Sequence, residues 1–589
     1  MRRNGRTTRA TGALVRCSVL AEIPRHGLAT IALVPFCQLR ERGFEAHSEG
    51  EQILALVVDQ VADLDPDSRE ARDESPIRFS RPVYTPDDGV YSQIVRDVVR
   101  QEIQAGEGSN FVISREARTK ITNFGPQIAE QIFWRLVRLE PNAYLTFSFC
   151  DGTTHWIGAS PERNVTIRGR TIVMNPICGT LPKTPDLSEA DLLAFVTDPK
   201  EIHELFQVVD EELKMMARLC PTGGRVVGPC LKEMGAVIHT EYVLEGETDV
   251  PPLDAFRESM FAPTMVGSPL QNAARVITRH EPGSRRYYSS AILILEGQGA
   301  ETSLDSAITI RTMELRSDGT GLVRAGASIV RDSDPEAEVQ EVAAKASTLL
   351  GALGPPGRAR VTGPPASQQV LDALRSRNSK LSEFWMTAQP DLLKPPSGLR
   401  AVLVDHEDDF SFMLAHLLRH AGIETEVRSF EDAVSRGDAD VFVLGPGPGN
   451  PLATEVAKIR ILHERIRTFV TEEVPFIAVC LSHQVLCHAL GLDLVRLDPP
   501  LQGVQKTVDL FGAREHVGFY NTFIPVARDA PPSGVEMSIL GEHVIALRSR
   551  RFVSFQFHVE SVLTTRGMQI LENGVAFLRP SLDAEVASR

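Results

Sequence analysis

The sequence predicts an α/β protein of at least two domains, with mixed strands and helices in its first part and a doubly wound parallel sheet near its C-terminal end. Three observations predict this. The 589 residues exceed the roughly 250–300 residues at which single hydrophobic cores stop growing. After residue 400, short apolar strands alternate with helical segments, which is typical of a parallel sheet covered on both faces. Proline and glycine clusters at 354–357, 363–365 and 394–398 separate the two parts.

These signals divide the chain into five segments. Residues 1–27 are expected to form a disordered or poorly ordered tail, because residues 1–16 hold arginines but no acid and no long apolar run; a targeting peptide is the alternative. The first domain covers residues 28–351 and opens with a strand-like run at 29–36. Residues 352–399 are expected to form a linker with one docked helix at 368–385. The last domain covers 400–579, and 580–589 form a tail.

Composition and charge exclude several classes of protein. With 42% hydrophobic and 24% charged residues, the chain resembles an ordinary soluble globular protein. The net charge of -15 argues against a nucleic-acid partner. No apolar run reaches the roughly 18–20 residues of a membrane span. The 8 cysteines lie far apart, which argues against a disulfide framework or a zinc site and favours a reducing cytoplasm.

A candidate nucleophile lies in the last domain. Its predicted elements are a strand at 400–405, a helix to about Ala421, a strand at 441–444, and a buried strand at 474–479 that runs into a helix. Cys480 stands on the turn between this last strand and helix, an arrangement typical of a nucleophile elbow. A helix N-terminus lowers the pKa of a thiol and raises its nucleophilicity. The turn Gly445-Pro446-Gly447-Pro448-Gly449 follows another strand, and its N–H groups can face an oxyanion.

A candidate base follows downstream. Residues 555–561 alternate as a strand, which would place His558 and Glu560 on one face. Taken singly, a buried cysteine or histidine is more often a core residue. Together with the glycine-proline turn, however, these segments resemble the class I glutamine amidotransferases, particularly the anthranilate synthase type, over residues 400–579.

The resemblance implies a role for each residue that matches the motif. Cys480 would form a glutamyl thioester, with His558 as its base and Glu560 orienting that base. The oxyanion and glutamine positions would be Gly447, Pro448, Gly449, Leu481, Gln484, Thr522 and Phe523. The chain departs from the usual pattern at Ser482, Asn521 and Val559, where a glycine, a histidine and a proline are usual. The side chain of Ser482 is expected to tighten the elbow.

Two acidic helices are predicted in the first domain. Residues 198–210 have helical spacing, with Glu204 at the edge of the buried face, and residues 335–345 place Glu338, Glu341 and Lys345 on one face. Carboxylates from two helices that meet in a cleft suit Mg²⁺, which takes oxygen ligands. The alternative for either helix alone is a solvated charged face.

Four further segments lie between or beside these helices, at 174–180, 261–269, 310–312 and 324–330. In this order they resemble the chorismate-utilising enzymes, the family of anthranilate, aminodeoxychorismate, isochorismate and salicylate synthases, over about residues 85–350. The resemblance implies an α+β domain with large sheets, and Mg²⁺ held by Glu204 and Glu341 with Glu201 and Glu338 nearby. The implied chorismate-binding residues are Gly179, Thr180, His239, Thr264, Tyr288, Arg311, Gly326, Ala327, Ser328 and Lys345.

The nucleophile is expected to be ammonia. Water-using members of this family carry a lysine base where this chain has Asn110, and a neutral amide cannot deprotonate water. Segments 206–218, 239–242, 260–264 and 517–523 look like the phenazine type of the family, which stops at 2-amino-2-desoxyisochorismate (ADIC). His239 favours the alternative, a single-chain anthranilate synthase that also eliminates pyruvate. Ser289, Ser290 and Ser328 stand where glycines are usual.

The resulting hypothesis is a two-domain enzyme that uses chorismate and L-glutamine, passes ammonia internally and works as a homodimer. A second alternative from another class is a non-catalytic regulatory protein that keeps the fold. That alternative predicts no glutamate release at all.

Overall fold

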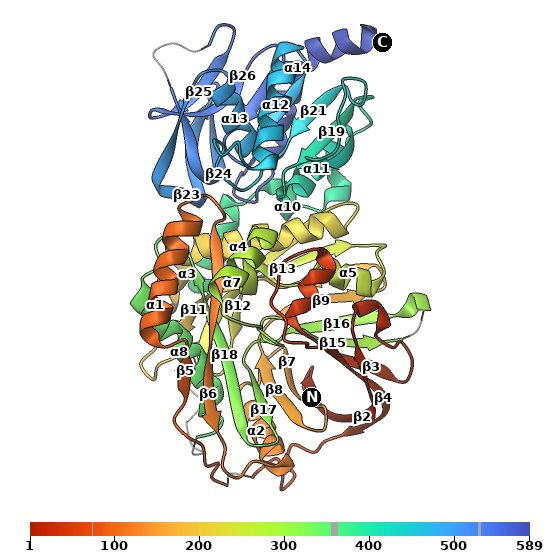
Figure 1. Cartoon of the computed structure of the whole chain (residues 1–589), viewed down its shortest axis with the longest axis vertical. Coiled ribbons are helices and arrows are strands. Elements are labelled where there is room, and N and C mark those ends of the chain that lie inside the picture. Colours follow the sequence, from red (N-terminus) through yellow and green to blue (C-terminus); the bar gives the residue numbers. More distant parts are fainter. Residues whose placement is uncertain (74, 298, 355–362, 528–531, 589) are drawn as a thin grey trace.

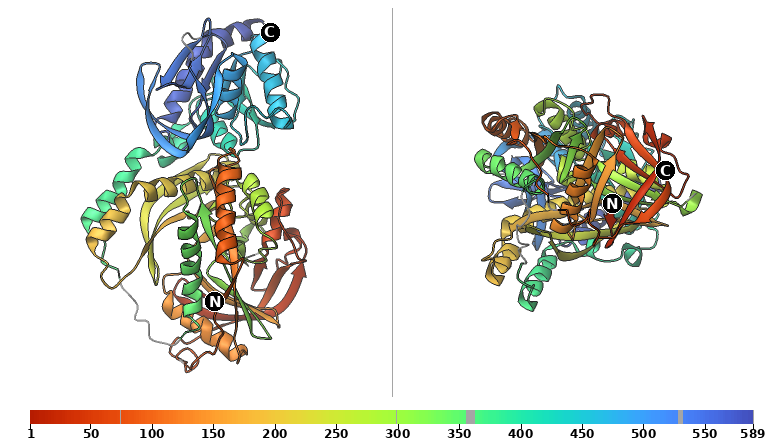
Figure 2. Two further views of the ribbon diagram at one scale, coloured as in Figure 1. Left: turned by 60° about the vertical axis from the view of Figure 1, so that its left-hand side comes forward. Right: turned by 90° about the horizontal axis from the view of Figure 1, so that it is seen from below.

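The computed structural model describes the whole chain except residues 74, 298, 355–362, 528–531 and 589. It has two lobes, a lower one formed by the first 350 or so residues and an upper one formed by the C-terminal part (Figure 1). The chain between 363 and 399 first runs along the outer edge of the lower lobe and then reaches the junction of the lobes (Figure 2). The first proline-glycine cluster of the predicted linker falls mostly at 355–362, outside the described residues.

The lower lobe is built on antiparallel strands that form two sheets joined by strand β2 (Arg6–Cys17), in agreement with the predicted α+β class. The first sheet contains β1 (Arg2–Arg3), β7 (Leu145–Cys150), β8 (Thr154–Ser160), β17 (Thr312–Arg316), β18 (Thr320–Ile329), β6 (Asn110–Lys120), β5 (Val83–Thr85) and β14 (Gly267–Ser268). The second contains β4 (Ile53–Asp63), β3 (Ala29–Val34), β15 (Ala291–Glu296), β16 (Ser303–Ile308), β9 (Arg163–Arg168), β10 (Thr171–Met174), β13 (Val237–Glu247), β11 (Ile177–Pro182) and β12 (Gly224–Glu233).

The predicted tail at 1–27 is wrong. Strand β2 pairs with β4 from Thr8 to Cys17, so this segment is part of the second sheet. The arginines that suggested a tail find acids elsewhere in the chain, as Arg6 does with Asp63 and Arg9 does with Glu130. The local sequence could not show these partners because they lie about 60 and 120 residues away.

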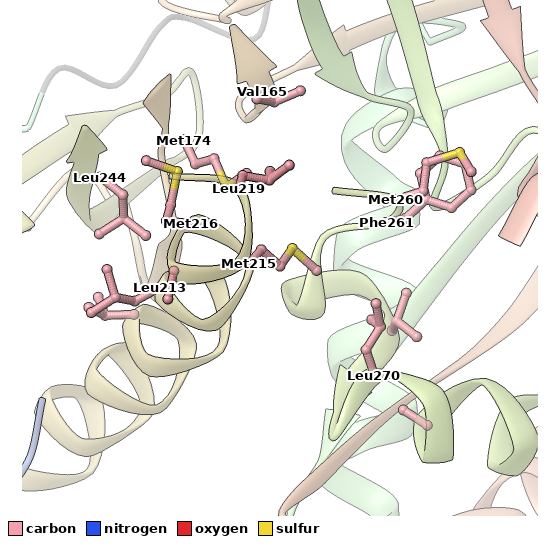
Figure 3. Close-up of a cluster of buried hydrophobic side chains, with 14 of the residues drawn as sticks. Val165, Met174, Leu213, Met215, Met216, Leu219, Leu244, Met260, Phe261 and Leu270 are labelled. Carbon is pink, nitrogen blue, oxygen red and sulfur yellow. The ribbon is translucent and has the colours of Figure 1, made fainter. Parts of the chain in front are cut away.

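The helices of the lower lobe pack against these sheets. The longest is α4 (Pro199–Leu219), which begins with Asp198 accepting a hydrogen bond from the backbone N–H of Lys200. Its apolar residues Leu213, Met215 and Met216 enter the buried cluster drawn in Figure 3. The other helical segments are η1 (Leu20–Glu22), η2 (Phe36–Arg42), α1 (Asp88–Asp97), η3 (Val98–Ile103), α2 (Pro126–Leu139), α3 (Glu189–Thr197), α5 (Pro252–Glu258), α6 (Pro263–Val266), α7 (Leu270–His280), η4 (Gly299–Glu301) and α8 (Pro335–Gly351).

The segment predicted to carry one docked helix carries two. Helix α9 (Gln368–Ser376) packs beside α3, and the short helix α10 (Glu383–Met386) follows the turn η5 (Arg377–Lys380) and precedes η6 (Gln389–Leu392). The helical spacing is interrupted at Arg377, whose buried guanidinium donates to the carbonyl of Val196 at 2.6 Å. This tertiary contact ends the helix where the sequence pattern alone would continue it.

The upper lobe has the predicted doubly wound sheet. Parallel strands lie in the order β20 (Glu424–Ser429), β19 (Arg400–Asp405), β21 (Val441–Leu444), β22 (Phe476–Val479) and β27 (Phe552–Phe555). Antiparallel strands extend it, namely β26 (His543–Arg548), β25 (Glu536–Leu540), β24 (Ala513–Val526) and β23 (Asp493–Leu510). Its helices are α11 (Phe410–His420), α12 (Ala457–Thr471), α13 (Leu481–Ala489) and α14 (Gly567–Ser588). Helix α14 continues to Ser588, so the segment predicted as a tail at 580–589 is helical up to that residue.

Across the described part of the chain, no helix combines the length and apolar character needed to cross a membrane.

Candidate active sites

The turn that carries Cys480 is strained. Cys480 has φ 53° and ψ -106°, and it lies between the last residue of β22 and the first residue of α13. Its N–H donates to the carbonyl of Phe555 at 2.8 Å, which ties the turn to the neighbouring strand. A non-glycine residue held at positive φ persists only where its surroundings enforce it. The buried thiol is thereby presented at the N-terminus of α13, next to the carbonyl of Tyr520 at 3.7 Å.

His558 and Glu560 meet, but not on a strand. Strand β27 ends at Phe555, and His558 forms only an isolated bridge with Gly518 before a turn at 559–560. The predicted strand at 555–561 is therefore wrong. The turn still brings Nδ1 of His558 to 2.8 Å from Oε1 of Glu560, with both side chains buried.

The electrostatics of this pair favour an imidazolium. Burial lowers the pKa of His558, but the charges of Cys480 and Glu560 more than offset burial, so the pKa stands well above its usual value. Nδ1 is occupied by Glu560, while the buried Nε2 has no hydrogen-bond partner within the described residues. The ring of Phe410 packs against the imidazole with centroids 4.4 Å apart. His558 is thus held in one orientation with one nitrogen left for chemistry.

A pocket of about 500 Å³ opens beside Cys480 and His558. Most of the residues predicted at the glutamine site line it, namely Gly447, Pro448, Gly449, Gln484, Thr522 and Phe523. Leu481 is adjacent to Gly447, since a Cβ on that glycine would lie 3.1 Å from Cδ2 of Leu481. Leu481 is also the first residue of α13. The N–H of a first helical residue has no hydrogen-bond acceptor within the helix.

The unusual residues of this site make local hydrogen bonds. The hydroxyl of Ser482 donates to the carbonyl of Gly445 at 2.7 Å, so its side chain fastens the elbow to the glycine-proline turn. The amide of Asn521 donates to the carbonyl of Phe523 at 2.9 Å, and that of Gln484 donates to the same carbonyl at 2.7 Å. These substitutions fix the pocket wall and remove no reacting group.

One wall of the pocket comes from the lower lobe, which the sequence did not predict. Its residues are Gly106, Gly108, Ser109, Lys214, Ser268 and Pro269. The N–H of Gly449 donates to the carbonyl of Gly106 at 3.1 Å, which closes the loop onto the glycine-proline turn. Lys214, from α4, lies 2.6 Å from Glu211 and 3.2 Å from Asp408, over the ring of Phe410. No sequence pattern marks these residues because they come from separate segments.

A second pocket, of about 300 Å³, lies in the lower lobe and is lined by His239 and Arg311, among others. Nδ1 of His239 lies 2.6 Å from the carbonyl of Gly179, and the hydroxyl of Thr180 lies 3.3 Å from the same nitrogen. Since a carbonyl can only accept, Nδ1 carries the proton and Nε2 carries the lone pair. Burial lowers the pKa of His239 to about 4, so the ring is neutral at neutral pH.

The predicted carboxylates gather near this pocket on α4 and α8. Glu204 contacts Lys200 at 3.4 Å, and Glu341 contacts Lys345 at 2.6 Å. Burial and the charge of Glu341 raise the pKa of Glu338 to about 7. Burial also raises the pKa of Glu201, and the charge of Glu204 raises it further. Burial raises the pKa of Glu204 as well, and there the charge of Glu341 adds to the effect.

The remaining predicted positions frame the same region. The ammonium of Lys345 donates to the carbonyl of Gly326 at 3.0 Å, and a Cβ on Gly326 would lie 3.2 Å from the hydroxyl of Tyr288. Gly326 and Ser328 face one side of β18, and Ala327 is buried on the other. Thr264 donates to Glu162 at 3.0 Å. Glu162 was not predicted; burial raises its pKa to about 8.

Ser289 and Ser290, which stand where glycines are usual, donate hydrogen bonds to backbone carbonyls. The hydroxyl of Ser289 donates to the carbonyl of Met265 at 2.8 Å, and that of Ser290 donates to the carbonyl of Val34 at 2.7 Å. Both side chains are buried in these backbone contacts.

The two lobes correspond to two known families. Residues 36–351 match the chorismate binding enzymes, and residues 402–577 match the class-I glutamine amidotransferases. Both predicted resemblances are confirmed, and the first begins earlier than residue 85.

Relatives that contain both lobes narrow the assignment. The phenazine-specific anthranilate synthase of Pseudomonas chlororaphis is 43% identical over 560 residues, covering 92% of this chain and 87% of that protein. Its counterpart from Pseudomonas fluorescens is 41% identical over 604 residues, covering 98% and 94%. The menaquinone-specific isochorismate synthase from Escherichia coli has a similar fold, with a TM-score of 0.50 and 20% identity over 60% of this chain and 87% of that one. The chain therefore belongs to the chorismate-binding family that includes the phenazine-specific anthranilate synthases.

Proposed function

We propose that the protein aminates chorismate at C2 to give ADIC, in a Mg²⁺-dependent reaction that takes ammonia from L-glutamine. The observation that carries the proposal is the pocket beside Cys480, one wall of which belongs to the chorismate-binding lobe. Ammonia released there is already at the boundary of the lobe that would consume it. The match to the chorismate binding enzymes supports the substrate, and the names of the two long relatives support the pathway type.

In the glutaminase lobe, Sγ of Cys480 attacks the carboxamide carbon of glutamine. His558 takes the thiol proton and returns it to the departing nitrogen, which leaves as ammonia, while Glu560 holds the imidazole through Nδ1. The N–H groups of Gly447 and Leu481 would donate to the oxyanion. Water then hydrolyses the glutamyl thioester to glutamate and restores the thiol.

In the lower lobe, the residues present fit a divalent cation. Glu201 and Glu338 each keep one buried carboxylate oxygen without a hydrogen-bond partner in the described structure, and Glu204 and Glu341 lie beside them. Among the described residues, no three His, Cys, Asp or Glu side chains form a group that could hold a metal ion by themselves. Mg²⁺ usually keeps water and substrate oxygens among its ligands. Glu204 and Glu341 would hold the ion, and Mg²⁺ there would supply positive charge to a substrate carboxylate.

Two cations of this lobe would bind the anionic substrate. The guanidinium of Arg311 lines the second pocket, and Lys345 reaches the same region from α8. Both can pair with a carboxylate of chorismate. Ammonia adds at C2 and the ring hydroxyl leaves as water, which completes the amination.

The second candidate is an anthranilate synthase that goes on to eliminate pyruvate, and His239 favours it by its place in the pocket. Loss of pyruvate needs a base that removes a proton from the ring. The neutral ring of His239 carries its lone pair on Nε2, so the product assay decides between the two candidates.

The test is an incubation with chorismate, glutamine and Mg²⁺. We expect one glutamate for each chorismate consumed, with no anthranilate fluorescence and no pyruvate. Stoichiometric pyruvate would refute ADIC as the product. Absence of glutamate would favour a regulatory protein that keeps the fold. Internal passage of ammonia, a homodimer and a cytoplasmic location belong to the same proposal; light scattering checks the dimer.

A further inference from the structure

Helix α4 lies in the part of the chorismate-binding lobe that faces the glutaminase lobe (Figure 1). One fully buried carboxylate of this helix, that of Asp210, contacts the glutaminase lobe. Asp210 has no exposed surface. Its oxygens accept hydrogen bonds from the hydroxyl of Tyr520 at 2.8 Å and from the N–H of Val562 at 2.8 Å, and also from the hydroxyl of Ser561. All three donors belong to the glutaminase lobe, and the chemistry proposed above uses none of them.

Each of these donors is next to a residue of the catalytic triad, either in the sequence or by a direct contact. Ser561 and Val562 directly follow Glu560, and the N–H of Ser561 donates to the carbonyl of His558 at 3.4 Å. The thiol of Cys480 donates to the carbonyl of Tyr520 at 3.7 Å. The ring of Tyr520 meets the imidazole of His558 edge to face, with centroids 5.4 Å apart. Asp210 therefore contacts residues on two sides of the triad, through the hydroxyls of Tyr520 and Ser561 and the backbone N–H of Val562.

Glu212, two residues further along α4, is a buried acid without such donors in the described structure. Glu212 is 2% exposed, yet neither of its carboxylate oxygens has a hydrogen-bond partner among the described residues. It faces Glu162 of its own lobe, and burial together with Glu162 raises its pKa far above the usual range. A buried charge is retained only where donors compensate its lost hydration. Asp210 has three such donors and Glu212 has none.

We propose that Asp210 is a positioning residue of the glutaminase: it holds the 558–562 turn and Tyr520 in place, so that docking of α4 assembles the triad. This inference rests on the proposed function for the identity of the reaction. Hydrogen bonds to a charged group are the stronger kind; here two of them join α4 to the 558–562 turn, and the third joins α4 to Tyr520 of strand β24. Without them the turn has fewer restraints on the distance between Cys480 and His558.

The test compares Asp210→Asn with Glu212→Gln as a matched control. Both replace a buried carboxyl of α4 by the amide of the same shape. For Asp210→Asn we expect kcat with glutamine to fall about 10- to 100-fold, because misplacement of a reacting group by about 1 Å has an effect of this order. The KM for glutamine should change less than threefold and the rate with an ammonium salt less than twofold. Glu212→Gln should leave the ratio of glutamine to ammonium rates unchanged.

A second measurement does not depend on turnover. The rate at which iodoacetamide alkylates Cys480, followed by mass spectrometry of its peptide, should fall in Asp210→Asn. The exposed Cys150 and Cys230 are internal references whose rates should stay constant. Tyr520→Phe removes one of the hydrogen-bond donors to Asp210. Asp210→Asn should lower the alkylation rate less in the Tyr520→Phe protein than in the wild type, because the two residues act together.

The outcomes separate the possibilities. If Asp210→Asn lowers the rates with glutamine and with an ammonium salt equally, Asp210 has only a structural role. If it lowers neither rate, Asp210 positions nothing. Either result overturns the proposal. If the wild-type protein aminates chorismate with neither nitrogen source, the proposed function fails. The alkylation rate of Cys480 then still decides the role of Asp210, and an unchanged rate overturns it.

Discussion

Replacement of Glu560 by Gln tests how much of the glutaminase reaction depends on one buried charge. The change keeps the shape and leaves an amide oxygen to accept the hydrogen bond from Nδ1 of His558, now 2.8 Å from Oε1. It removes the negative charge. At a charge separation of about 4 Å and an effective dielectric of about 20, that charge is worth up to about 4 kcal/mol to the imidazolium. A loss of about 2–4 kcal/mol corresponds to a fall of about 30- to 1,000-fold in rate.

The direction follows from the pKa of His558. Burial alone would lower it, and the charges of Cys480 and Glu560 raise it well above its usual value. Without Glu560 one of these opposing charges is lost, so less imidazolium is present to protonate the departing nitrogen.

The assay measures glutamine-dependent and ammonium-dependent product formation in the same preparation. Only the first should fall, since Glu560 lies in the upper lobe. Glu515→Gln is the control, because it makes the same change to a carboxylate of this lobe that pairs with Arg566 outside the pocket. A Glu560→Gln protein that keeps glutamine turnover within threefold of the wild type would refute the electrostatic argument.

Three further predictions concern other parts of the molecule. Cys480→Ala should abolish glutamine-dependent synthesis and leave the ammonium route intact, as followed by chorismate consumption; loss of both routes would contradict two separate sites. Glu341→Gln should lose at least 100-fold in both routes, and its apparent affinity for Mg²⁺, read from a Mg²⁺ titration of a fluorescence or activity signal, should weaken; an unchanged titration would remove Glu341 from the cation site. His416 has its pKa lowered to about 4 by burial, whereas in the unfolded chain it titrates near 6.5; the stability that the neutral ring contributes is complete above about pH 6.5 and is lost as the pH falls toward 4. At pH 5 the loss of unfolding free energy amounts to about 2 kcal/mol. His416→Gln should therefore show a smaller drop in Tm between pH 7 and pH 5 than the wild type, and an equal drop would contradict this role of His416.

Local patterns predicted the elements that are determined locally. The strands at 400–405 and 441–444 were predicted at their observed bounds, because a short continuous apolar run between polar segments is typical of a buried strand. The Cys480 turn was found because strand, turn and helix signals follow one another within about ten residues. The resemblance to known motifs added the roles of residues whose geometry no local pattern reveals.

Tertiary contacts decided what the sequence could not. Residues 1–27 were expected to lack structure because their arginines had no local partners, and the structure supplies those partners from Asp63 and Glu130. The segment 555–561 alternates like a strand, but it turns at Val559 because the carbonyl of Glu560 is held by the indole N–H of Trp385 at 2.7 Å, and Val562 by Asp210. In each case the deciding group lies more than 50 residues away in the chain.

The contacts between the lobes explain why the glutaminase site should be considered a property of the whole chain. Trp385 from the linker, Asp210 from α4 and Gly106 from the loop before β6 all bind backbone or side-chain groups next to the triad or its glycine-proline turn. These contacts are hydrogen bonds in a buried setting, where an unsatisfied partner costs more than the bond contributes. Separation of the lobes would therefore exchange these hydrogen bonds for bonds to water and remove the restraints on the groups around Cys480, and the pocket would lose the wall that holds Lys214. The peptide link between the lobes keeps them near each other, whereas the hydrogen bonds determine whether the triad is assembled.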